Sequence, residues 1–152
     1  MRVQCKAKKT QTSPLHASPL RHLKASTLNS YQIKTVKRIV DGDTYDLLID
    51  LGFGAALDIR VRLLGVDTPE LRGQTKEKGK AASRAVSEFF AQYMTKNQTT
   101  IDRGYEFKAQ QRCCVICKTT RKDSFGRWLA SISCGTHDLA DYLLKSGNAK
   151  PY

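Results

Sequence analysis

The sequence predicts an α+β domain, mainly β, in which a small barrel of five strands is covered by two packed helices. Short segments of alternating apolar residues are separated by turns that contain Gly and Asp, which is typical of a strand meander. Later segments change to a three- and four-residue apolar spacing, which is typical of helices. The length of 152 residues suits one domain with a single core.

We expect a basic, low-complexity arm over residues 1–30, followed by one folded domain over residues 31–152. The arm contains six Lys or Arg and no Asp or Glu, and it repeats Ser-Pro-Leu around the helix breakers Pro14 and Pro19. Such a composition favours disorder. Three roles stay open for the arm: a cationic aid to nucleic-acid binding, a solvated tail without a specific role, and an organellar transit peptide.

The first half of the domain is expected to contain three strands. "YQIKTVKRIV" (31–40) is the first strand, and "DGD" (41–43) is a turn because its glycine accepts positive φ between two short acids. "TYDLLIDL" (44–51) returns as the second strand. "GFGAAL" (52–57) is expected to be a loop, and "DIRVRLLGV" (58–66) is the third strand.

Residues 79–97 are expected to form a helix whose apolar stripe packs on the core. The stripe consists of Ala82, Ala85, Val86, Phe89, Phe90 and Tyr93. Two further strands, 113–120 and 127–134, flank the turn "RKDSFG", and a short helix over 137–147 ends at a glycine. Residues 98–112 have no clear pattern and could form a strand with a hairpin insertion.

The charge of the chain indicates a polyanionic partner. The formal net charge is +12, and residues 31–152 remain basic with 20 Lys or Arg against 14 Asp or Glu. A basic surface concentrates nucleic acid or anionic lipid, although solubility alone also explains it. We expect no membrane span and no secretory signal peptide, because no apolar run is long enough. Five cysteines without an export signal favour free thiols and a cytoplasmic location.

Clustered carboxylates follow two of the predicted strands. In "VRLLGVDTPE", Pro69 stops the strand and turns the chain so that Asp67 and Glu70 come close together. Asp41 and Asp43 stand at the end of another strand. If these strands are neighbours, the acids converge and favour a hard cation such as Ca²⁺ or Mg²⁺. The alternative is that they are ordinary turn residues.

Two arginines favour a phosphate ligand for this region. Arg62 lies inside an apolar strand, where a lone arginine is uncommon unless it has a partner. Arg127 follows the turn "DSFG" at the start of another strand. Guanidinium groups match phosphate oxygens, so two of them beside a carboxylate-held cation suit phosphodiester hydrolysis.

The motifs that carry these residues resemble a known family. "VDGDTYDLLID", "VRLLGVDTPE" and "DSFGRWLASI" resemble, in order and spacing, three motifs of the staphylococcal nuclease (thermonuclease) family. The "LGFG" loop and the "AKPY" ending are more similar to the short members found in phages and prophages. The resemblance covers residues 33–152. It implies an OB-type five-stranded barrel and Ca²⁺-dependent hydrolysis of DNA and RNA. Because the signal peptide of the secreted members is not found here, the expected location is the cytoplasm of a bacterial or phage-infected cell.

The resemblance also implies a metal site. Asp43 and Asp67 would bind the ion through their side chains, and Thr68 would bind it through its backbone carbonyl. Glu70 would contact the metal shell and orient or deprotonate the attacking water. Asp41 would support the turn as an outer acid.

For the substrate, the resemblance implies that Arg62 bridges the phosphate and the metal site, and that Arg127 stabilises the transition state and the leaving oxygen. The family's Lys-Tyr pair before Gly-Arg reads Ser124-Phe125 here, so a stacking ring is kept and a charge is lost. Tyr152 is a candidate for a second base-stacking position.

A structural zinc site is the alternative interpretation of the cysteines. Cys114, Cys117, Cys134 and His137 form a C-x2-C…C-x2-H pattern. A C-x2-C pair on a regular strand points its thiols to opposite faces, and "CVIC" lacks a turn residue. Cysteine also packs well in a core. Core packing is therefore favoured over zinc.

Taken together, the sequence predicts a metal-dependent endonuclease that acts as a monomer on single-stranded or locally open DNA or RNA. The alternative function is an OB-type module that binds nucleic acid without cutting it. Such domains typically lose the acids or the arginines, whereas this chain keeps Arg62, Glu70 and Arg127 together with Asp43 and Asp67.

Overall fold

The computed structural model describes residues 30–98, 105–109 and 115–152. Nearly the whole of the predicted basic arm lies outside these residues. Cys113, Cys114 and most of residues 98–112, which have no clear sequence pattern, also lie outside them.

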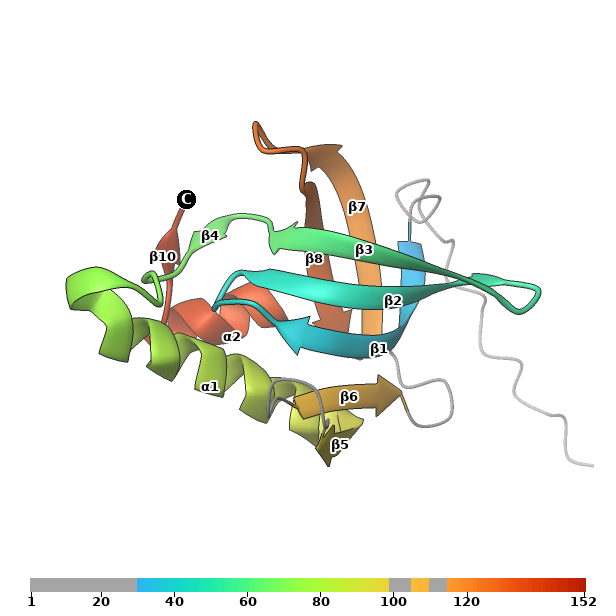
Figure 1. Cartoon of the computed structure of the whole chain (residues 1–152), viewed down its shortest axis with the longest axis horizontal. Helices are drawn as coiled ribbons and strands as arrows, with labels where there is room; N and C mark the ends of the chain where they lie inside the picture. Colours follow the sequence, from blue (N-terminus) through green and yellow to red (C-terminus); the bar gives the residue numbers. More distant parts are fainter. Residues whose placement is uncertain (1–29, 99–104, 110–114) are drawn as a thin grey trace, which may run out of the picture.

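Five strands pair side by side in a ring (Figure 1). β1 (Ser30–Ile39) is antiparallel to β2 (Thr44–Gly52), which is antiparallel to β3 (Ala55–Leu63). β3 lies parallel to β8 (Trp128–Cys134), and β8 pairs with β7 (Val115–Lys122). β7 pairs in turn with β1. The predicted OB-type arrangement of five strands is therefore confirmed.

The connection between β2 and β3 is shorter than predicted. Residues 52–57 were expected to form a loop, but strand pairing continues to Gly52 and resumes at Ala55. Gly52, Phe53 and Gly54 all have positive φ, which closes the turn tightly and leaves the following alanines free to pair. The hairpin extends beyond the rest of the barrel (Figure 1).

The third strand also ends earlier than predicted. β3 stops at Leu63, and Gly65 at φ 82° separates it from the short β4 (Val66–Asp67). β4 pairs with β10 (Lys150–Pro151), a pairing that no sequence pattern predicted. Asp67 thus belongs to a separate two-stranded ladder beside the barrel.

The long helix is displaced toward the N-terminus relative to its prediction. A 3-10 turn (η2, Gly73–Thr75) leads into α1 (Lys76–Tyr93), and Met94 is already extended. The predicted last turn instead forms β5 (Met94–Gln98), which pairs with β6 (Tyr105–Ala109). Cross-strand pairing here overrides the helical spacing, because residues 94–98 gain a hydrogen-bonded partner strand.

The second helix is shorter than the predicted 137–147. β9 (His137–Asp138) pairs with β8, and α2 (Leu139–Lys145) begins only after Asp138. The Asp138 carboxylate accepts hydrogen bonds from the backbone N of Ala140 and of Asp141, which makes it the N-cap.

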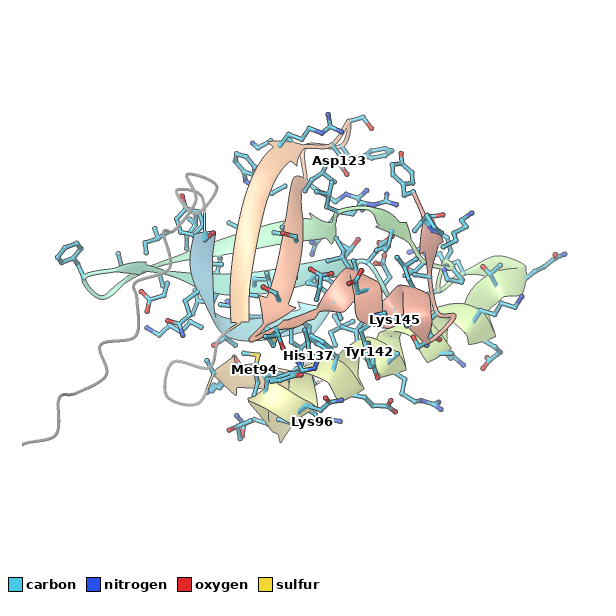
Figure 2. All side chains as sticks on the ribbon, turned by 180° about the vertical axis from the view of Figure 1, so that it is seen from behind. Met94, Lys96, Asp123, His137, Tyr142 and Lys145 are labelled. Carbon is cyan, nitrogen blue, oxygen red and sulfur yellow. The ribbon has the colours of Figure 1, made fainter. Side chains whose placement is uncertain are left out.

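The two helices pack against each other and against the barrel. Phe89 on α1 lies 5.3 Å from Tyr142 on α2 between ring centroids, and Phe90 contacts Tyr45 on β2 edge-to-face. Figure 2 shows Tyr142 and His137 gathered close to Met94 near the end of α1. This core leaves one rim of the barrel free for polar side chains. No helix among the described residues is long and apolar enough to cross a membrane.

Candidate active site

One rim of the barrel forms a cavity of about 600 Å³. Three strand ends and the turn between β7 and β8 contribute to it. The lining residues are Asp41, Asp43, Arg60, Arg62, Asp67, Thr68, Pro69, Glu70, Phe125 and Arg127. Four acids and three arginines thus share one cavity.

The turn between β1 and β2 is fixed in place by close packing. Asp43 N donates to the Asp41 carboxylate at 3.2 Å, and the Tyr45 hydroxyl donates to the Gly42 carbonyl at 2.6 Å. A Cβ on Gly42 would lie 2.7 Å from Thr68 Oγ1, so only glycine lets this turn reach the strand end that carries Thr68.

Asp43 is the most buried acid of the cavity, with 6% of its surface exposed. Its carboxylate accepts hydrogen bonds from Thr44 Oγ1 at 3.0 Å and from Thr68 N at 3.4 Å. Desolvation, together with the hydrogen bond and charge of Asp41, raises the pKa of Asp43 to about 6, and the charge of Arg62 offsets this only in part. A cation in the cavity would relieve this cost.

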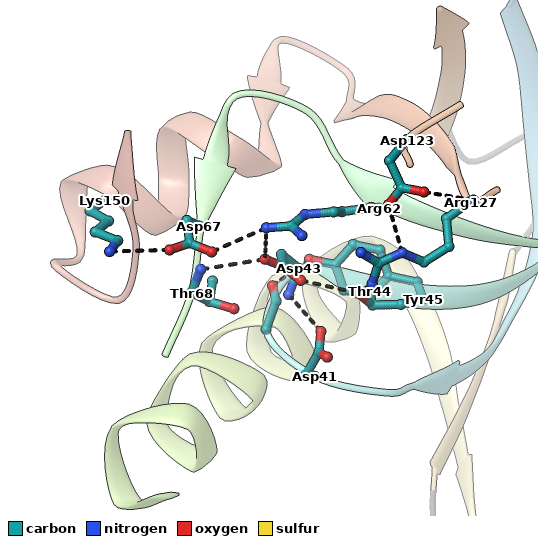
Figure 3. Close-up of polar contacts among 11 residues, drawn as sticks. Asp41, Asp43, Thr44, Tyr45, Arg62, Asp67, Thr68, Asp123, Arg127 and Lys150 are labelled. Atoms are coloured by element: carbon teal, nitrogen blue, oxygen red, sulfur yellow. Dashed lines mark hydrogen bonds and ion pairs between the residues drawn. The ribbon is translucent and has the colours of Figure 1, made fainter. Parts of the chain in front are cut away.

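Arg62 joins the two acids that follow different strands (Figure 3). Its Nη2 donates to Asp67 Oδ1 at 3.1 Å and lies 3.3 Å from Asp43 Oδ2. The other Asp67 oxygen pairs with Lys150 Nζ at 3.2 Å, and the Tyr152 ring lies 5.2 Å from the Arg62 guanidinium carbon. The unusual arginine of the apolar strand therefore has carboxylate partners.

Glu70 stands on the corner that Pro69 makes, directly above helix α1. The Thr75 hydroxyl donates to the Glu70 carbonyl at 3.2 Å, and a Cβ on Gly79 would lie 2.6 Å from the same oxygen. The Glu70 side chain is exposed and lines the cavity. Asp67 and Glu70 thus line the same cavity.

Arg127 is held by the turn that precedes it. Its Nε donates to Asp123 Oδ2 at 2.8 Å, its backbone N donates to Asp123 Oδ1 at 2.9 Å, and its Nη1 reaches Thr44 Oγ1 at 3.3 Å. Desolvation would raise the pKa of Asp123, but hydrogen bonds from Arg127 and from Phe125 N hold it below its usual value. The Phe125 ring is 81% exposed and lies 5.4 Å from the Arg127 guanidinium carbon.

The donor set fits a hard cation better than a soft one. Within the described residues, no group of three or more His, Cys, Asp or Glu side chains is already arranged around a metal position, and Arg62 stands between Asp43 and Asp67. The available ligands are nevertheless carboxylate and carbonyl oxygens, which hard divalent ions prefer. The buried, partly compensated Asp43 carboxylate is a group that such an ion would stabilise.

The zinc alternative concerns the opposite end of β8 (Figure 2). Cys134 is fully buried in the core, and His137 Nδ1 lies 2.9 Å from the Tyr93 hydroxyl. Cys114 lies outside the described residues, as does the side chain of Cys117. Cys134 therefore has the core position that the packing interpretation predicts.

Most of the site residues predicted from the sequence come together. Eight line the cavity: Asp41, Asp43, Arg62, Asp67, Thr68, Glu70, Phe125 and Arg127. Ser124 is exposed in the neighbouring turn, and Tyr152 contacts Arg62 without lining the cavity.

Three residues were missed by the sequence reasoning. Arg60 lines the cavity, Asp123 holds Arg127, and Lys150 pairs with Asp67. The alternation of a strand could have indicated Arg60, which is two residues from Arg62 and on the same face. Asp123 opens a turn motif that could have suggested its role. Lys150 carries no such signal, because it depends on the pairing of β10 with β4.

Chemically, the cavity presents oriented guanidinium groups beside carboxylate oxygens. Guanidinium groups bind phosphate oxygens, and buried carboxylates bind a divalent ion or accept a proton. The arrangement suits a phosphate ester better than an acyl or glycosidic substrate, because the charges of the cavity match a phosphate and its cation.

Comparison with known proteins agrees with this chemistry. The family model described as staphylococcal nuclease homologue matches residues 60–152. A thermonuclease from Staphylococcus intermedius is 33% identical over 118 residues, which cover 76% of this chain. The matched region spans 56% of the length of that thermonuclease.

Proposed function

Because the chain belongs to the staphylococcal nuclease homologue family, we propose that it is a metal-dependent nuclease that hydrolyses phosphodiester bonds of DNA or RNA. One observation carries the proposal: Arg62 and Arg127 line the same cavity as Asp43, Asp67 and Glu70. These are the groups that phosphodiester hydrolysis needs for charge neutralisation, water alignment and transition-state stabilisation.

Arg62 and Arg127 are proposed to bind the scissile phosphate. Arg62 comes from β3 and Arg127 from the start of β8, and these two strands are parallel neighbours. Each guanidinium is held by a carboxylate and thus arrives in the substrate complex already oriented. Arg127 is assigned the further role of stabilising the charge that develops on the five-coordinate phosphorus and on the leaving oxygen.

Glu70 is proposed to position the attacking water and take up its proton. It is an exposed carboxylate on a corner fixed by Pro69 and by the close packing of Gly79. A general base must lie within hydrogen-bond reach of the water, and the fixed corner limits where this carboxylate can go.

The proposed cofactor is Ca²⁺, with Mg²⁺ as the other hard ion that suits these ligands. It would be held by Asp43, by Asp67 and by the backbone carbonyl of Thr68, with Asp41 and Glu70 nearby. When bound, such an ion supplies Lewis-acid stabilisation of phosphate charge.

Single-stranded or locally open nucleic acid is the proposed substrate form, and the proposed enzyme is a monomer. The exposed Phe125 ring at the cavity rim supports an unpaired substrate, because a base must be unstacked before it can stack on an aromatic side chain.

The test is hydrolysis of a labelled single-stranded DNA by purified protein in Ca²⁺, in Mg²⁺ and in a chelator. We expect cutting that requires the ion and that falls by about 10²–10⁴-fold in Glu70→Gln, the usual range for general acid–base help. Lys37→Ala, which removes an exposed cation outside the cavity, is the control. Binding without cutting under every ion would refute the nuclease and favour the OB-type binding module.

A further inference from the structure

A third arginine of the cavity, Arg60, is held by a carboxylate in the same way as Arg127. Arg60 Nε donates to Asp46 Oδ1 at 2.6 Å, and its Nη2 donates to Asp46 Oδ2 at 2.8 Å. Arg127 is likewise held by a carboxylate on its Nε. In the described part of the chain, Arg60 Nη1 has no hydrogen-bond partner, although the residue lines the cavity.

The position of Arg60 relative to Arg62 follows from the strand that carries both. They are separated by one residue on β3, so their side chains share a face and their Cα atoms lie about 7 Å apart along the strand. This is close to the distance between neighbouring phosphates of an extended single strand. Two arginine side chains that leave the strand at this spacing can each reach one phosphate of the same nucleic-acid chain.

The surroundings of Arg60 favour an anion over a purely structural salt bridge. Its side chain is 52% exposed, so a ligand can reach the guanidinium while Asp46 holds it. Both ends of the Asp46 carboxylate are used to hold one edge of the guanidinium. The other edge is left for a ligand, as expected for a bidentate orienting contact.

We propose that Arg60 is a second phosphate subsite, which binds the internucleotide phosphate next to the one that is cut. This inference rests on the proposed nuclease function and deepens it: the substrate class is an oligonucleotide with at least one charged linkage beside the scissile one. The subsite makes cutting inside a chain faster than cutting of an ester with no neighbouring phosphate.

The experiment uses an end-labelled single-stranded oligonucleotide with one neutral methylphosphonate linkage, in the presence of Ca²⁺. Cutting is measured separately at each remaining linkage, so distant linkages in the same molecule are the internal control. For the wild-type chain we expect cutting at one of the two adjacent linkages to fall about tenfold, the usual effect of losing one charge-assisted hydrogen bond.

In Arg60→Ala the decrease in cutting next to the methylphosphonate should disappear, because the arginine that binds the neighbouring phosphate is gone. This variant should also cut all-phosphate DNA about tenfold more slowly than wild type does. Lys37→Ala removes a cation from the same sheet outside the cavity and should keep the local loss. Arg60→Gln, which can still donate to Asp46, replaces the alanine variant if that variant does not fold.

An equal local loss in wild type and in Arg60→Ala would overturn the subsite, as would the absence of any loss in wild type. Failure of the wild-type chain to cut any linkage is a different result: it refutes the nuclease itself, and the subsite with it.

Discussion

A Cβ atom on Gly79 would lie 2.6 Å from the carbonyl oxygen of Glu70, so helix α1 packs directly under the corner that carries this carboxylate. The helix therefore does more than cover the core. It sets the position of a cavity residue through its backbone, and only glycine leaves room for this approach.

Gly79→Ala is expected to displace Glu70. The neighbouring atoms are backbone, which cannot rotate away, so the corner itself must move. We expect kcat to fall about tenfold or more, since small misplacements of catalytic groups are costly. The gain in helix propensity, about 1 kcal/mol, partly offsets the steric cost to stability. Lys80→Ala, one residue along and exposed, is the control; an unchanged kcat in Gly79→Ala would contradict the packing argument.

Asp123→Asn is expected to lower kcat more than it raises KM. The change keeps an acceptor for the backbone N of Phe125 and of Arg127, but it removes the charge that holds Arg127 Nε. A less oriented guanidinium loses most in the transition state, and we expect a decrease of about 10-fold to 100-fold in kcat. Steady-state kinetics decide the point, with Lys37→Ala, which changes an exposed residue outside the cavity, as the control. A pure increase in KM would indicate that Arg127 only anchors the ground state.

Asp43→Asn is expected to stabilise the metal-free fold at neutral pH. The folded protein raises the pKa of Asp43 to about 6 from an ordinary value of 3.8, so it holds this proton more tightly than the unfolded chain does. The contribution of this proton to the free energy of unfolding is fully present below about pH 4 and is lost as the pH rises through about 6. At pH 7 the asparagine should therefore raise Tm by several degrees, corresponding to about 1–3 kcal/mol, and the gain should vanish near pH 4.

Melting curves in a chelator at both pH values measure this effect. Asp58→Asn, which alters an exposed acid paired with Lys37, is the matched control and should show no such pH-dependent gain. A Tm for Asp43→Asn that is lower than wild type at pH 7 would mean that its hydrogen bonds to Thr44 and Thr68 outweigh the cost of the buried charge.

The basic arm is expected to contribute to DNA binding through charge. Replacing Lys6, Lys8 and Lys9 by Ser should reduce the slope of log K against log salt by up to about two for a single strand, if all three contact phosphates. Binding of uncut DNA in a chelator, measured across salt concentrations, gives the slope. An unchanged slope would identify the arm as a passive tail.

The sequence predicted the acids of the site because they stand where strands end, and it predicted Arg62 because a lone arginine is uncommon inside an apolar strand. Pro69 and the glycine of the 41–43 turn mark two of these ends plainly, and the strand meander brings neighbouring ends together. The residues next to each of these side chains were sufficient for the prediction, because a turn or a strand end is determined within a few residues.

What the sequence did not predict depends on distant pairing. The last turn of the expected 79–97 helix became β5 because β6 offers it a partner, and helical spacing cannot reveal such competition. Lys150 reaches Asp67 through the β4–β10 ladder, which joins segments far apart in the chain. Arg60 was overlooked because its partner, Asp46, lies across a hairpin whose register the sequence left open.

The parallel pairing of β3 with β8 has a consequence for how the protein acquires activity. Arg62 and Arg127 become neighbours only when this long-range contact forms, and a contact between distant segments costs loop-closure entropy before it gains stability. Helix α1 and the β2–β3 hairpin, by contrast, form from local contacts. During refolding, the spectroscopic signals of the helix and the hairpin should therefore return before activity does. The return of catalysis should coincide with the pairing of β3 with β8, which closes the ring of strands.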